Sequence, residues 1–405
     1  MKILFFIFSF FIAGTIHASV LHVGAGFPYQ TLDHASRDAR DGDTILVHTG
    51  TYSGDIYLGN LRGTPSGWIN IIKAPGATVF YSGGSTGWHL SDVAYLYIKG
   101  FVFENQTGNG FNIDDGNSYD TPSHHVILDS CTFRNINATG NNDLLKMSGV
   151  DDFEIRNCIF LNGSKGGSGI DMVGCHNGLI TCCHFENMGN NSVQAKGGSS
   201  NIRIVRNFFR NGGQRTLNLG GSTGLPYFRP AGAAYEASGL GVYSNIIIGS
   251  DAPIAFTGCV NTEVVNNTIY LPSRWVIRIL QENTDNERFV PCGKNSFINN
   301  IIYRDNRISA DCNIGPGTDA GSFTFSNNIW YNPQNSGWKG PVLPVTERNG
   351  IVGKDPLFAD AGSDNFALQK GSPAIGAGIN VGLPFPDYSG VPYSNPRSAG
   401  ALEFK

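Results

Sequence analysis

The sequence predicts an all-β protein, a single-stranded parallel β-helix in which short strands stack coil upon coil into a solenoid. A small or amide residue recurs two positions before an apolar one, at intervals of 22 to 28 residues with two longer ones of 38 and 33. That interval is typical of one coil of such a fold. The apolar runs are short, β-branched and bounded by Gly and Asn, which disfavours helical repeats. The composition agrees, with 53 Gly and 15% charged residues.

The recurring residues form one predicted internal ladder. They are Cys131, Cys158, Cys183, Asn207, Asn245, Asn267, Asn300 and Asn328. Asn tolerates a left-handed backbone, and its amide can bond to copies above and below, so we expect each Asn to make a tight turn. The three cysteines are expected to be small buried side chains. A disulfide among Cys259, Cys292 and Cys312 stays open.

The N-terminal sequence predicts that the protein is exported. Residues 1–18 read as a secretory signal, with Lys2 as the charged start, an apolar stretch from Leu4 to Ala13, and a cleavage site at Ala18. No later run of 18 or more apolar residues exists, so we expect a secreted or periplasmic protein without a transmembrane anchor.

Residues 19–340 are predicted to form the β-helix domain. Residues 21–23 read as a first strand, and an amphipathic helix over 29–40 is expected to cap the open end of the first coil. The stretch 44–47 reads as the next strand. Residues 341–405 lose the ladder, and we expect this C-terminal segment to cover the last coils rather than to form a separate catalytic domain.

A column of polar residues is predicted on one outer face of the helix. Four short strands place one polar residue between two apolar ones, at intervals of 25, 23 and 24 residues. Because strand side chains alternate between faces, the polar residues point outward and stack from coil to coil. The column comprises Lys146, Asp171, Gln194 and Asn218. It is the candidate site, with Asp171 as an acid, a base or an orienting group and the two amides as ligands of sugar hydroxyls.

Two insertions leave the repeat directly after strands of this column, where they would wall a groove. The first covers residues 222–236 and the second residues 281–291. Aromatic and charged side chains in them are candidate sugar ligands, although aromatic residues that anchor a loop would give the same pattern. The candidates are Tyr227, Arg229, Tyr235 and Glu236 in the first insertion, and Gln281 and Glu282 in the second.

The segment Arg274-Trp275-Val276-Ile277-Arg278 places two arginines four residues apart. Strict alternation puts both arginines outward and Trp275 on the opposite face. Arg278 continues the polar column. The pair is a candidate clamp for a carboxylate or sulfate, and salt bridges to Glu282 or Glu287 are the alternative.

The segment Ser192-Val-Gln-Ala-Lys-Gly-Gly-Ser-Ser-Asn201, followed by Arg206-Asn207-Phe208-Phe209, resembles the motif around the catalytic lysine of one polysaccharide lyase family. That family contains chondroitinase B and alginate lyases, and its members are right-handed parallel β-helices of the pectate-lyase-like superfamily. The resemblance implies β-elimination on a uronate, with Lys196 as the base that removes the proton α to the carboxylate. The lysine must be partly neutral for this role. Arg215, Arg229 and Arg278 could neutralise the substrate carboxylate.

The sequence departs from the family's pattern at two places. The family carries an arginine on the next coil as proton donor, where this chain has Asn218 or Leu219. The family's calcium-binding carboxylates precede its lysine, where this chain reads Gly189-Asn190-Asn191. No cofactor is therefore certain, and a requirement for Ca²⁺ stays open.

Three function classes follow from these observations. The first is a lyase acting on an acidic glycan as a monomer. The second is a glycoside hydrolase using two carboxylates, Asp171 with Glu236 or Glu282. The third is a non-catalytic carbohydrate-binding or surface β-helix. A net charge of −4 gives no support for a nucleic-acid partner.

Overall fold

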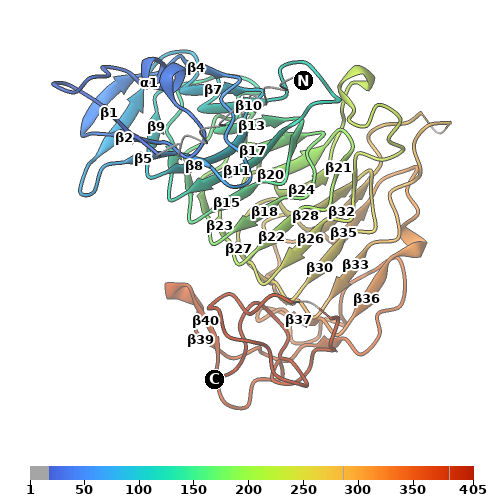
Figure 1. Ribbon diagram of the computed structural model, residues 1–405. Coiled ribbons are helices and arrows are strands. Elements are labelled where there is room, and N and C mark those ends of the chain that lie inside the picture. Colours follow the sequence, from blue (N-terminus) through green and yellow to red (C-terminus); the bar gives the residue numbers. More distant parts are fainter. Residues whose placement is uncertain (1–17, 286, 383) are drawn as a thin grey trace, which may run out of the picture.

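The computed structural model describes residues 18–405, except 286 and 383, and it is a parallel β-helix (Figure 1). The predicted secretory signal therefore lies outside the described residues, apart from Ala18. Three long parallel sheets run along the helix, and a typical coil contributes one strand to each. The fold class predicted from the repeat is confirmed.

The sheet that carries the polar column, called the site sheet below, has ten strands. They are, from the N-terminal end, β4 (Ile56–Gly59), β7 (Trp88–Ser91), β10 (Phe111–Asp114), β13 (Leu145–Ser148), β17 (Ser168–Val173), β20 (Asn191–Lys196), β24 (Arg215–Gly220), β28 (Ala252–Thr257), β32 (Trp275–Leu280) and β35 (Ala310–Ile314).

The second sheet has thirteen strands and the third has twelve. The second consists of β1 (Val20–Val23), β2 (Thr44–Val47), β5 (Ile69–Lys73), β8 (Ala94–Lys99), β11 (Ser123–Asp129), β15 (Glu154–Arg156), β18 (Leu179–Thr181), β22 (Arg203–Val205), β26 (Gly241–Tyr243), β30 (Glu263–Val265), β33 (Ser296–Ile298) and β36 (Thr324–Ser326), with β14 (Val150–Asp151) paired to β11. The third consists of β3 (Gly50–Ser53), β6 (Val79–Ser82), β9 (Val102–Glu104), β12 (Thr132–Arg134), β16 (Ile159–Leu161), β19 (His184–Glu186), β23 (Phe208–Arg210), β27 (Ile246–Ile248), β31 (Thr268–Tyr270), β34 (Ile301–Tyr303), β37 (Ile329–Tyr331) and β38 (Ile351–Val352).

Short elements complete the chain. A three-stranded sheet joins β21 (Ser199–Ser200), β25 (Ala237–Ser238) and β29 (Cys259–Val260), and β39 (Phe358–Asp360) pairs antiparallel with β40 (Asn365–Leu368). The 3₁₀ helices are η1 (Leu225–Tyr227), η2 (Ala320–Ser322) and η3 (Ala361–Ser363).

The interior is filled by stacks of identical side chains. Phe103, Phe133, Phe160, Phe185 and Phe209 stack with ring centroids 4.6 to 5.2 Å apart, close to the spacing of neighbouring parallel strands. Cys131, Cys158 and Cys183 are buried, as predicted. All eight cysteines of the chain are free thiols in the structure.

The Asn ladder is also confirmed as a chain of buried amide bonds. In each step the side-chain oxygen of one Asn accepts from the backbone N–H and the amide of the Asn one coil before, from Asn207 through Asn328. The Glu347 carboxylate takes the place of the next Asn and accepts from Asn328. Because a carboxylate has no N–H group of its own, the ladder ends at Glu347 without needing a further acceptor.

The predicted turn conformation of the ladder residues is wrong. The left-handed residues are those directly before the ladder, including Arg206, Ser244, Asn266, Asn299 and Asn327, with φ between 55° and 59°. The ladder Asn itself has an ordinary backbone and points inward, because its amide must reach carbonyls of the coil before, such as Ile180 for Asn207. The left-handed residue makes the corner and leaves the amide free to build the ladder.

The N-terminal end of the helix and one of its corners are covered. At the N-terminal end lies α1 (Leu32–Asp38), which buries Leu32 and Ala35 and is shorter than the predicted 29–40. The C-terminal segment is drawn in orange to red in Figure 1. It runs along the corner made by the left-handed residues. Backbone carbonyls of Tyr388, Pro386, Ser398, Ile379 and Ala377 accept hydrogen bonds from the side chains of five successive corner residues, Arg206, Ser244, Asn266, Asn299 and Asn327.

Candidate active site

The strand register brings the polar column together. Lys146 pairs with Asp171, Asp171 with Gln194, and Gln194 with Asn218, on four adjacent strands of the site sheet. The column continues through Ala255 to Arg278, one coil apart each. It was predicted from spacing alone, and it holds because every coil presents the same strand position outward.

Asp171 lies between two lysines at the centre of this column. Its carboxylate is 0% exposed, Lys146 donates to Oδ2, and Lys196 Nζ lies 3.3 Å from Oδ1. Lys196 is the last residue of β20, two positions after Gln194, so it points to the same outer face. The predicted base and the predicted carboxylate are therefore direct neighbours.

A second buried carboxylate, Asp143, lies below this group. Its Oδ2 is 3.9 Å from Lys146 Nζ, and its Oδ1 accepts from the backbone N–H of Ser168. Burial and the charge of Asp171 raise the pKa of Asp143 to about 7, although Lys146 lowers it. Burial also lowers the pKa of Lys146, but Asp171 and Asp143 together raise it above its ordinary value. Sequence reasoning missed Asp143 because nothing in the local pattern shows that it contacts the next coil.

Lys146 and Lys196 line a groove of about 550 Å³. Residues 222–229 of the first insertion form one wall, and residues 115–119, between β10 and β11, form the other. Both predicted insertions are present and leave the site sheet at the same corner, after β24 and β32. The second insertion packs against the first through Phe289 and Phe228, whose ring centroids are 5.3 Å apart.

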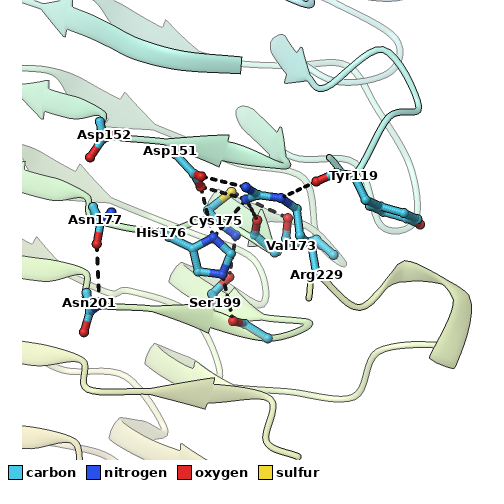
Figure 2. A network of polar contacts seen from close by, with 12 residues as sticks. Tyr119, Asp151, Asp152, Val173, Cys175, His176, Asn177, Ser199, Asn201 and Arg229 are labelled. Atoms are coloured by element: carbon cyan, nitrogen blue, oxygen red, sulfur yellow. Dashed lines mark hydrogen bonds and ion pairs between the residues drawn. The ribbon is translucent and has the colours of Figure 1, made fainter. Parts of the chain in front are cut away.

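The first insertion is tied to the helix by Arg229 (Figure 2). Its guanidinium makes two bonds to Asp151, Nη1 to Oδ1 at 2.7 Å and Nη2 to Oδ2 at 2.6 Å, and Nη1 also donates to the carbonyl of Gly174. A Cβ on Gly174 would lie 2.6 Å from the Cβ of Arg229, so only glycine allows this approach. Arg229, predicted as a substrate ligand, therefore holds the wall of the groove.

Asp151 and His176 complete this tie. His176 Nδ1 lies 3.0 Å from Asp151 Oδ1, and Nε2 lies 3.1 Å from the carbonyl oxygen of Gly198. Burial raises the pKa of Asp151, but hydrogen bonds from Arg229 and His176 lower it to about 2. Across the groove, Arg229 Nε donates to the carbonyl of Tyr119, and the Tyr119 hydroxyl donates to the carbonyl of Pro226. The two walls are thus joined to each other.

Glu236 is a second anchor of the first insertion. It is 1% exposed, and its oxygens accept from the backbone N–H groups of Gly197 and Thr223, the Thr223 hydroxyl and the Asn283 amide. These bonds join the residue after Lys196 to both insertions. Gln281 donates to the carbonyl of Asn283 in the second insertion and accepts from the N–H of Cys292, directly after it.

The predicted aromatic ligands separate into two environments. Tyr227 is 65% exposed and lines the groove. Tyr235 packs against a small apolar cluster of Phe228, Ala233 and Phe289 between the insertions. The structure therefore leaves Tyr227 open to a ligand and uses Tyr235 for packing.

On the far side of the column, Arg215 pairs with Glu282. Arg215 Nη2 lies 2.6 Å from Glu282 Oε1, and Nη1 lies 3.4 Å from Asn218 Oδ1. Asn218 is buried and also accepts from the Thr257 hydroxyl. Gln194 is buried as well and donates to the carbonyl of Gly220.

The predicted position of Trp275 is wrong. Arg274 Cζ lies 4.0 Å and Arg278 Cζ 4.4 Å from the centroid of the indole ring, so Trp275 shares the outer face with both arginines. The reason is local, because two consecutive residues, Val276 and Ile277, point inward and break the alternation. Arg278 Nε donates to Asn313 on the next strand.

The carboxylates beside Lys196 do not fit a protein-bound calcium ion. Ca²⁺ takes six to eight oxygen ligands, with carboxylates prominent among them. Both oxygens of Asp171 lie against lysines, and both oxygens of Glu236 accept from protein donors. Among residues 18–405, leaving out 286 and 383, no group of three or more His, Cys, Asp or Glu side chains is placed to hold a metal.

Comparison with known proteins identifies the fold. No protein-family model and no curated protein matches the sequence. Among solved structures, the chain is similar to the pectate lyase Pel9A, with a TM-score of 0.62, 16% identity, and coverage of 97% of this chain and 98% of that one. It is also similar to XylC in complex with xylose, with a TM-score of 0.53, 11% identity, and coverage of 84% and 87%.

An alginate lyase from Paenibacillus sp. str. FPU-7 also matches, with a TM-score of 0.47, 17% identity, and coverage of 74% of this chain and 96% of that one. The parallel β-helix fold expected from the sequence is confirmed, and the chain shares it with the pectate lyase Pel9A. Within the described part of the chain, no helix is long and apolar enough to cross a membrane.

Proposed function

We propose that this chain is an exported polysaccharide lyase that cleaves a uronate-containing glycan by β-elimination. The observation that carries the proposal is the arrangement of Lys146, Asp171 and Lys196 on the floor of the groove. The groove offers two amines side by side above one buried carboxylate. β-Elimination needs a base and a nearby cation, and this arrangement can supply both.

The two lysines have different surroundings, and this suggests different roles. The pKa of Lys146 lies above its ordinary value, so Lys146 keeps its proton and can bind the uronate carboxylate. Lys196 contacts only one oxygen of Asp171, at 3.3 Å, and its side chain is 14% exposed. Because Lys146 already pairs with Asp171, we assign the role of base to Lys196.

In the proposed step, Lys196 takes the proton from the carbon α to the carboxylate. The electron pair of the C–H bond forms the new C=C double bond, the glycosidic C–O bond breaks, and the leaving oxygen takes a proton from water in the groove. Lys146 stabilises the negative charge that develops on the carboxylate. Tyr227, exposed at the rim, provides an aromatic surface for a neighbouring sugar.

The alternative hydrolase would need free carboxylates. Of the candidates named from the sequence, Glu236 accepts four hydrogen bonds from the protein and Glu282 pairs with Arg215. Neither is placed as a free acid opposite Asp171. This supports the lyase over the hydrolase.

The test is to incubate the mature protein with alginate, pectate, chondroitin and dermatan and to follow the near-ultraviolet absorbance of the unsaturated uronate. We expect an increase with one of these glycans, and none with Lys196→Ala. Lys196→Arg separates charge from basicity, because arginine stays protonated, and we expect it to bind the glycan without cleaving it. Lys99→Ala, an exposed lysine on the second sheet, is the matched control.

New reducing ends without the absorbance change would favour the hydrolase. Glycan binding without either signal would favour the non-catalytic β-helix. Full activity of Lys196→Ala would overturn the assignment of the base while leaving the reaction class open to another group.

A further inference from the structure

A cluster of three arginines, Arg215, Arg274 and Arg278, lies on the outer face of the site sheet, away from Lys146 and Lys196. Arg274 and Arg278 both lie against the Trp275 ring, at 4.0 and 4.4 Å from its centroid. With guanidinium groups on it, the indole is not a free stacking surface for a sugar. Its role is to hold the two guanidinium groups in place by cation–π contact.

The cluster carries more positive than negative charge. Arg215 is paired with Glu282, but neither Arg274 nor Arg278 forms an ion pair with any residue that the structure describes. Burial, followed by the charges of Arg215 and Arg274, lowers the pKa of Arg278, while Glu282 raises it. Crowded guanidinium groups without matching carboxylates favour an anion from outside the chain.

The orientation of Arg278 is also fixed by a neighbour. Its Nε donates to Asn313 Oδ1 at 3.1 Å, on the next strand of the site sheet. This contact uses one donor and leaves the two terminal nitrogens for a ligand. The two terminal nitrogens of this planar group can each donate to one oxygen of a carboxylate, which accepts two parallel hydrogen bonds.

The cluster is aligned with the proposed catalytic group. Arg278 occupies the same column position as Gln194, which is three strands away through β24 and β28. At the spacing of parallel strands, three steps along the helix amount to about 14 Å. A glycan chain that runs parallel to the helix axis, above the buried Asn218 and Ala255, would therefore reach the arginines several sugar residues away from the bond above Lys196.

We infer that Arg274 and Arg278 form a distal subsite that binds the carboxylate of a second uronate residue of the same glycan chain. This inference rests on the proposed function and narrows its substrate class. The substrate has acidic residues on both sides of an interval of about 14 Å. It is a polyuronate, and a glycan with an isolated uronate would lack the second contact.

The test measures binding, so that it does not depend on catalysis. Uronate oligomers of increasing length, prepared from pectate and from alginate, are titrated into Lys196→Ala while tryptophan fluorescence is followed. We expect a fluorescence change only with oligomers long enough to reach Trp275, and none after Trp275→Phe. Affinities of both short and long oligomers are measured by isothermal titration calorimetry, which does not need the tryptophan signal. Adding Arg278→Gln should weaken the binding of the long oligomers by about tenfold or more and leave that of the short ones unchanged.

Arg37→Gln, which removes one exposed positive charge from α1, is the matched control for net charge and should change neither affinity. Equal losses for short and long oligomers, or no loss for either, would overturn the distal subsite. Failure of the lyase assay with retained, length-dependent binding would overturn the proposed reaction and leave the subsite standing. Tighter binding of chondroitin sulfate than of either polyuronate would mean that the arginines prefer a sulfate group to a carboxylate, and it would overturn the inference.

Discussion

Lys196 Nζ lies 3.3 Å from Oδ1 of Asp171, and the other oxygen of this fully buried carboxylate accepts from Lys146. One negative charge is therefore shared by two amines on neighbouring coils. Lys146 is the register partner of Asp171, whereas Lys196 pairs with Val173 and reaches Asp171 diagonally from two positions beyond Gln194. The pair of contacts is a direct product of the strand register.

Asp171→Asn should strongly destabilise the protein. The amide keeps the shape of the carboxylate but removes the charge that both lysines face, and breaking a buried ion pair by removing one partner costs roughly 3–5 kcal/mol. Urea unfolding followed by circular dichroism at neutral pH measures the change. Asp120→Asn, an exposed carboxylate, is the control and should stay within about 0.5 kcal/mol of wild type. A loss below about 1 kcal/mol for Asp171→Asn would contradict the buried charge pairing.

Asp143 should make stability depend on pH. Its folded pKa of about 7 lies above the value of about 4 in an unfolded chain. The folded state therefore binds the proton more tightly, and the associated stability is present at low pH and is lost as pH rises through 7. Asp143→Asn, which keeps the acceptor for Ser168, should remove this dependence.

The comparison of wild type and Asp143→Asn by thermal unfolding at pH 5 and pH 8 is the measurement. We expect the variant to gain roughly 2 kcal/mol relative to wild type between these two pH values. If the difference in stability between the two proteins is the same at pH 5 and pH 8, the Asp143 carboxylate is ionised over this whole range.

The bond between Arg229 and Asp151 should hold the first insertion. A double-mutant cycle with Arg229→Gln and Asp151→Asn should give a coupling of roughly 1.5–3 kcal/mol at neutral pH. The folded pKa of Asp151 is lowered to about 2, so this stability is present above pH 4 and is lost as pH falls towards 2. Repeating the cycle at pH 3 tests the sign of this pH dependence. A coupling energy that grows in acid would refute the ion pair between Arg229 and Asp151. Either single variant should also raise KM for the glycan, because the wall moves.

The Asn ladder should be a main source of stability in the C-terminal half. Asn267→Ala leaves the N–H and amide of Asn245 without their acceptor and the carbonyl of Val242 without its donor. Buried groups left without partners cost about 1–3 kcal/mol each, so we expect a loss of roughly 3 kcal/mol or more in the free energy of unfolding. Asn137→Ala, at an exposed position, is the control. Similar losses for both variants would show that the ladder adds nothing beyond surface asparagine.

Several parts of the site follow from the sequence alone. The alignment of Lys146, Asp171, Gln194 and Asn218 was predictable because coil length and side-chain alternation act locally and repeat. The shared corner of the two insertions was predictable for the same reason. Trp275 was placed wrongly because two consecutive inward residues interrupt the alternation, which only packing reveals.

The sequence by itself determined the solenoid, the outer column and the position of Lys196 on the outer face. These features depend on periodicities of two residues and of one coil. The tertiary structure decided which charges meet. Asp143 reaches Lys146, Asp151 holds Arg229 and Glu236 receives the N–H of Gly197 only after loops of different length have folded back onto the helix. The energies of these contacts depend on burial and on distances across coils, and no local pattern in the chain encodes either quantity.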